Sequence, residues 1–178
     1  MNYTSVPQIF GVIDETRAKI YSLVEGLSEE QLTARPNPNA WTALEIIEHL
    51  ALIEGRLVQL MTMMLTKAES AGAGKTDAPI EIEPFTLDEF VERSRNEKYT
   101  APEVVRPSGK ISLAEALAQL RRSREELQSL RRRIETTDLS NVTYPHPAFG
   151  PLNFYGWLAF IGIHEERHLR QAQDLLSS

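Results

Sequence analysis

Four long stretches of this sequence repeat their apolar residues every three or four positions, which is the pattern of amphipathic helices. In the third stretch, leucine or isoleucine recurs every seven residues from Leu113 to Ile134, and such a face requires partner helices. Alternation typical of strands is almost absent. The four stretches run from about 9 to 26, from 42 to about 70, from 112 to about 136 and from about 153 to 176.

A long connection that contains four prolines separates the second stretch from the third. It spans 72–109, and one capping-box pattern at 86–89 predicts a short helical interruption within it. The helices on either side begin at capping boxes whose first residues are Thr42 and Ser112. The sequence therefore predicts an all-α four-helix bundle with a long crossover connection between helices two and three, in a single domain over 1–178.

Composition excludes several classes of protein. Hydrophobic residues make up 42% of the 178 residues and charged residues 25%, so the chain is expected to fold. There is no cysteine, and any bound metal must therefore take nitrogen and oxygen ligands. The chain has neither a secretory signal pattern nor an apolar run of membrane-spanning length, so we expect a cytoplasmic protein with no membrane partner.

The balance of charge argues against nucleic acid as a partner. Lys and Arg number 19 against 25 Asp and Glu, which gives a formal net charge of −6. Glutamates are interleaved with the arginines of the third stretch, and we interpret this side as a solvated, salt-bridged face. The arginines concerned are Arg121, Arg122, Arg124, Arg131, Arg132 and Arg133.

Three histidines are the candidates for chemistry. His164 and His168 are four residues apart in the fourth helix, a spacing that places both imidazoles on one face. The charged residues around them are expected to point mostly elsewhere: Glu165, Glu166, Arg167 and Arg170. Such a pair also occurs as a surface pair or as two hydrogen-bonded core histidines. His49 lies among aliphatic residues of the second helix and is expected to face the same interior. Three imidazoles from two helices can hold a divalent ion with an open position for water or substrate.

Two segments resemble a known family. WTALEIIEHL (41–50) resembles the Trp-Ser-x-x-Glu-x-x-x-His-Leu signature of the DinB-like superfamily, also called damage-inducible-like or bacillithiol-transferase-like metalloenzymes. HPAFGPL (146–152), Trp157 and HEERHLRQ (164–171) are similar to the closing part of that family. The resemblance implies a bundle, usually a homodimer, in which His49, His164 and His168 bind a divalent metal. Zinc or nickel comes first among the candidate ions, followed by iron or manganese.

The resemblance also implies a reaction class. Family members of known activity are mostly thiol-dependent transferases or isomerases, in which a low-molecular-weight thiol binds the metal and attacks an electrophile. We expect a small-molecule substrate and a thiol S-transferase, or a related transferase or hydrolase. The alternative is a non-catalytic helical binding or stress-response module in which the histidines hold a structural metal or none.

Three further polar residues have roles that the sequence leaves open. Glu45 either completes the capping box with Thr42 or supports the site as a base or as a partner of a ligand. Gln171 either orients a ligand or contacts solvent, and His146 is expected to be structural, at the mouth of the bundle.

Overall fold

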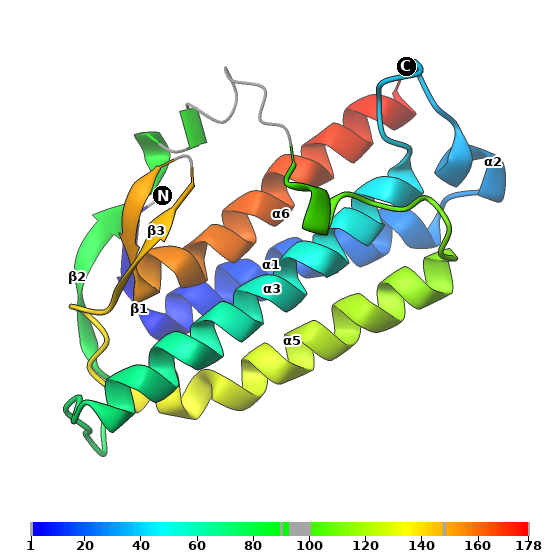
Figure 1. Cartoon of the computed structure of the whole chain (residues 1–178). Coiled ribbons are helices and arrows are strands. Elements are labelled where there is room, and N and C mark those ends of the chain that lie inside the picture. Colours follow the sequence, from blue (N-terminus) through cyan, green and yellow to red (C-terminus); the bar gives the residue numbers. More distant parts are fainter. Residues whose placement is uncertain (1, 90, 93–100, 148, 178) are drawn as a thin grey trace.

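The computed structural model describes residues 2–89, 91–92, 101–147 and 149–177, and four long helices account for most of them. The helices are α1 (Val6–Glu25), α3 (Ala43–Ser70), α5 (Leu113–Thr136) and α6 (Phe154–Leu176). They form the predicted four-helix bundle (Figure 1). None of the helices in the described ranges combines the length and the apolar character that a membrane span requires.

The helix starts follow from local capping. The hydroxyls of Thr42 and Ser112 accept hydrogen bonds from the backbone N–H three residues later, in the predicted capping boxes. The short helix α2 (Glu29–Thr33) has a third capping box at Ser28. Helix α1 begins three residues earlier than the apolar periodicity predicts, because Ser5 caps it and Pro7 is tolerated in a first turn.

The predicted crossover makes two neighbouring helices parallel. At the start of α3, Glu48 accepts hydrogen bonds from Ser108 and Gly109, just before α5 begins. At the other end, Arg133 of α5 pairs with Glu69 of α3. Helices α3 and α5 therefore run in one direction, while α1 and α6 run together in the other (Figure 1). The helical interruption expected to start at 86–89 lies partly outside the described ranges; within them, residues 88–89 and 91–92 are helical.

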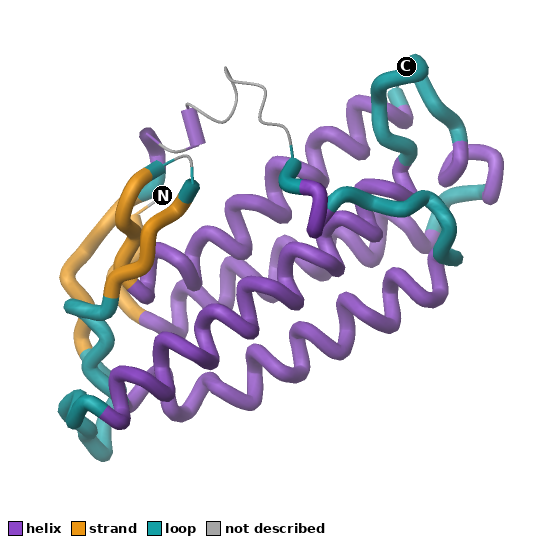
Figure 2. The backbone as a smooth tube through the Cα atoms, in the orientation of Figure 1, coloured by secondary structure: helices purple, strands orange, loops and turns teal. Residues whose placement is uncertain are grey.

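Four short strands, which the sequence analysis did not predict, lie at one end of the bundle (Figure 2). Strand β1 (Asn2–Ser5) pairs antiparallel with β2 (Glu81–Thr86), and β3 (Thr143–His146) forms a hairpin with β4 (Gly150–Asn153). Each has four to six residues and three of them contain proline, so none shows sustained alternation.

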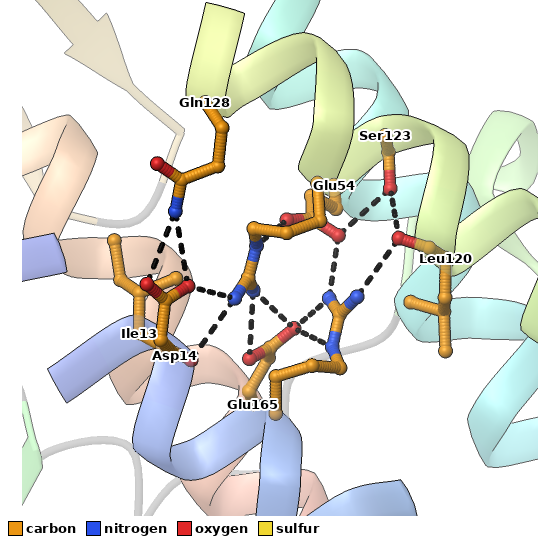
Figure 3. A network of polar contacts seen from close by, with 9 residues as sticks. Ile13, Asp14, Glu54, Leu120, Ser123, Gln128 and Glu165 are labelled. Carbon is orange, nitrogen blue, oxygen red and sulfur yellow. Dashed lines mark hydrogen bonds and ion pairs between the residues drawn. The ribbon is translucent and has the colours of Figure 1, made fainter. Parts of the chain in front are cut away.

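A layer of buried charge divides the apolar core into two clusters. Each long helix contributes one residue to it: Arg17, Glu54, Arg124 and Glu165. Arg17 contacts all three other helices, because it pairs with Glu54 and Glu165 and donates to the carbonyl of Leu120. Arg124 also pairs with both glutamates (Figure 3).

This layer corrects two expectations from the sequence. Arg124 does not lie on a solvated face, and Glu165 does not point away from the interior, since both are buried. They occupy core positions of their helices, where burial of a charge is tolerated because an opposite charge and hydrogen bonds meet it.

Candidate metal centre

The structure brings the three predicted histidines together between α3 and α6. His49 comes from the second turn of α3, and His164 and His168 lie one turn apart on α6. One ring nitrogen from each can be chosen so that the three atoms lie within 4.8 Å of one another. His49 and His168 are buried and His164 is half-buried.

Two of the three imidazoles are oriented by hydrogen bonds at Nδ1. The Nδ1 of His49 lies 2.7 Å from the carbonyl oxygen of Val105, which can only accept, so this nitrogen carries the proton. The Nδ1 of His168 lies 2.8 Å from Oε1 of Gln171 and donates to it in the same way. Both rings therefore keep an unprotonated Nε2, the form that binds a metal. Gln171 thus orients a candidate ligand, one of the two roles that the sequence left open.

The carbonyl that contacts His49 belongs to the crossover connection. We call residues 101–110 the strap; it includes the 3-10 turn η1 (Glu103–Val105). The strap is attached to α3 by Glu48, whose buried carboxylate accepts from the backbone N–H and hydroxyl of Ser108 and from the N–H of Gly109, at 2.7 to 2.9 Å. The sequence analysis missed Glu48, because its partners lie about sixty residues further along the chain.

The environment of the cluster keeps its three imidazoles uncharged at neutral pH. Burial is the main cause that lowers the pKa of all three imidazoles, and it takes the pKa of His168 to about 3 and that of His164 well below its usual value. The positive charge of Arg167 lowers all three further. At neutral pH the imidazoles are therefore uncharged, as metal ligands must be.

Aromatic rings flank the cluster. The half-buried Trp41 lies 4.7 Å from the ring of His49 and 6.2 Å from that of His168, measured between centroids. The ring of Phe160 lies 5.5 Å from that of His164, also between centroids. Trp41 precedes its helix in a loop, so helical spacing does not place its ring at the site. Phe160 lies four residues before His164 on α6, and that spacing does bring the two rings to one face.

Glu45 and His146 take structural positions. The carboxylate of Glu45 completes the capping box with the N–H of Thr42 and pairs with Arg35, so it is already engaged outside the cluster. His146 packs in β3 against Phe149, Trp157 and Phe160, with centroid distances of 4.8 to 5.0 Å.

The fold and the site together define a class of protein: helical bundles with a three-histidine cluster between two of the helices. The model of the DinB superfamily matches residues 13–172, and the chain belongs to that superfamily. The uncharacterized protein YuaE of Bacillus subtilis is 31% identical over 166 residues, which cover 92% of this chain and 94% of YuaE.

Two solved structures share the fold. TT2238, described as a four-helix bundle protein, superposes with a TM-score of 0.65 at 23% identity, over 96% of this chain and 99% of that one. YfiT from Bacillus subtilis superposes with a TM-score of 0.62 at 19% identity, over 96% of this chain and 85% of YfiT. YfiT is described as a probable metal-dependent hydrolase with an unusual four-helix bundle topology.

Proposed function

We propose that this chain is a divalent-metal-dependent enzyme in which His49, His164 and His168 hold the ion. The observation that carries the proposal is the convergence of three neutral imidazoles, with donor atoms within 4.8 Å of one another. Three protein ligands leave a coordination position open, which is the arrangement of catalytic sites rather than of closed structural ones. The description of YfiT, which has this fold, supports the same class of function.

The donor set fits a divalent transition metal, because neutral imidazoles suit zinc, nickel or iron(II). An ion bound here would lower the pKa of a water or thiol at its open position and hold the resulting anion. The residues of the chain supply orientation: the carbonyl of Val105 fixes His49, and the amide of Gln171 fixes His168. The ring of Trp41 lies next to two of the candidate ligands, His49 and His168.

Within this class we propose attack on a small electrophilic substrate. In thiol S-transfer, the sulfur of a low-molecular-weight thiol forms a bond to carbon, and the leaving group departs with the electron pair. In hydrolysis, the oxygen of water takes the place of sulfur. Both reactions require the same open position, and a small chloroaryl electrophile with a thiol, compared with a nitrophenyl ester, separates them experimentally.

Elemental analysis of protein purified without chelator or affinity tag tests the site. We expect about one equivalent of a divalent metal in the wild type and its loss in His49→Ala, His164→Ala and His168→Ala, because each variant removes a ligand. His146→Ala is the matched control, since it is the remaining histidine of the chain and packs against aromatic rings. Full metal affinity in all three ligand variants would contradict the proposal.

A further inference from the structure

Arg167 of α6 is a charged residue next to the histidine cluster. It lies on α6 directly before His168 and three residues after His164, so its side chain starts on the face that carries the cluster. The side chain is half-buried, and among the described residues none forms a hydrogen bond or an ion pair with it. By contrast, Arg170 on the same helix is exposed and pairs with Glu166 at 2.9 Å.

The charge of Arg167 acts on all three candidate ligands. Burial is the larger cause of their lowered pKa values, and the guanidinium contributes at His49, His164 and His168 alike. An arginine stays protonated in a protein, so this positive charge is permanent.

Four carboxylates of α3 and α6 near the cluster have other partners. Glu165 lies in the buried charged layer, Glu166 pairs with Arg170, Glu48 holds the strap and Glu45 pairs with Arg35. With three neutral imidazoles, a divalent ion would add two positive charges beside the positive charge of Arg167. An added anion would balance this positive charge, and an arginine fork matches the two oxygens of a carboxylate.

We propose that Arg167 is the substrate-recognition residue of this site and that it takes a ligand carrying a carboxylate close to its metal-binding atom. The carboxylate of the ligand balances the positive charge of the ion and of Arg167, and the arginine fixes which end of the ligand faces the metal. The inference rests on the proposed metal site and narrows its substrates to small carboxylates.

Two small thiols that differ at one end test this preference. Protein loaded with Co(II) is titrated with mercaptoacetate and, separately, with 2-mercaptoethanol, and the absorption of thiolate-bound Co(II) reports binding. We expect the wild type to bind mercaptoacetate more tightly than Arg167→Gln does, by about tenfold or more, because the variant loses a charge-assisted pair. Binding of 2-mercaptoethanol should change little, so the ratio of the two affinities collapses in the variant.

Two further variants control the experiment. Arg167→Lys keeps the charge without the fork and should retain part of the preference, while Arg170→Gln should retain all of it. Co(II) affinity without thiol should be equal or higher in Arg167→Gln, because a repulsive charge is removed. That readout does not depend on any reaction.

The outcomes separate this inference from the proposed site. If wild-type protein binds Co(II) and Arg167→Gln keeps the wild-type ratio of affinities, the recognition role is overturned and the metal site stands. If the wild type binds no Co(II), the metal site and the recognition role are both overturned. Circular dichroism of each variant shows whether it is folded. If Arg167→Gln does not fold, the test compares the affinity ratio of Arg167→Lys with that of the wild type.

Discussion

Burial gives His146 a protonation behaviour unlike that of an exposed histidine. Its ring lies among Phe149, Trp157 and Phe160, and loss of hydration lowers its pKa from the usual 6.5 to about 4. Unfolding returns the ring to water and restores the higher pKa. Between about pH 6.5 and pH 4, the unfolded chain therefore binds more protons at this residue than the folded chain does.

This difference predicts that the metal-free protein loses stability as the pH falls through that window. Replacing His146 with Gln removes the titrating group, so the slope of the unfolding free energy against pH should become shallower between about pH 6.5 and pH 4. Urea unfolding at several pH values measures the slope. Tyr144→Phe in the same strand should leave the slope unchanged, and a slope for His146→Gln equal to that of the wild type would argue against a buried neutral ring.

The sequence identified the candidate ligands but not what orients them. The spacing of His164 and His168 is a local property of one helix, and the signature at 41–50 contains His49. The carbonyl that fixes His49 belongs to Val105, 56 residues away in a proline-containing connection, and no local pattern specifies that pairing. Only Gln171, one turn from His168, was within reach of helical spacing.

At the scale of elements, the strap and helix α3 are joined by the carboxylate of Glu48. It accepts three hydrogen bonds from Ser108 and Gly109, and the strap in turn presents the carbonyl of Val105 to His49. Docking of the strap and orientation of the metal ligand are therefore parts of one arrangement. By linkage, loosening the strap would weaken the proposed metal binding, and a bound metal would protect the strap.

Glu48→Gln tests this connection. The neutral amide is a weaker acceptor and points N–H donors toward the donors of the strap, so amide hydrogen exchange over 103–110 should accelerate. Zinc affinity should fall by about tenfold or more, the usual effect of losing a group that orients a ligand. Glu69→Gln, at the far end of α3, where Glu69 pairs with Arg133, is the matched control. Unchanged zinc affinity in Glu48→Gln would show that the orientation of His49 does not depend on the attachment of the strap by Glu48.

Elements differed in how well the sequence predicted them. The long helices could be predicted because their apolar period and capping boxes are local, as at Thr42 and Ser112. Strand β1 could not, because its partner β2 lies about eighty residues later and both strands are too short to show a pattern.

At the scale of the whole molecule, the charged layer joins all four helices where the two apolar clusters meet. Each of its members lies between a residue of one cluster and a residue of the other, as Arg17 does between Ile13 and Ile20, and Glu165 between Ile161 and Leu169. A single charged residue among the apolar positions of a helix could therefore have been used to predict where the layer lies along that helix. Which charges meet could not be predicted, because every partner lies on another helix.

The layer predicts an unequal response in two adjacent glutamates. Glu165→Gln leaves Arg17 and Arg124 short of a buried counter-charge, and we expect it to lower the free energy of unfolding by about 3–5 kcal/mol. Glu166→Gln breaks only the pair with the exposed Arg170, and we expect a loss of at most about 1 kcal/mol. Urea denaturation of the two variants and the wild type gives both values.

The size of the Glu165 effect reflects uncompensated charge more than lost attraction, and a fourfold variant distinguishes these causes. When Arg17, Glu54, Arg124 and Glu165 are all replaced with Met, no charge remains unpaired in the layer. The fourfold variant should then be more stable than Glu165→Gln, because buried ion pairs contribute little net stability over apolar residues of similar volume. If the fourfold variant is instead the less stable of the two, mutual attraction within the layer holds the four helices together. The loss of unfolding free energy in Glu165→Gln would then come from lost attraction and not from uncompensated charge.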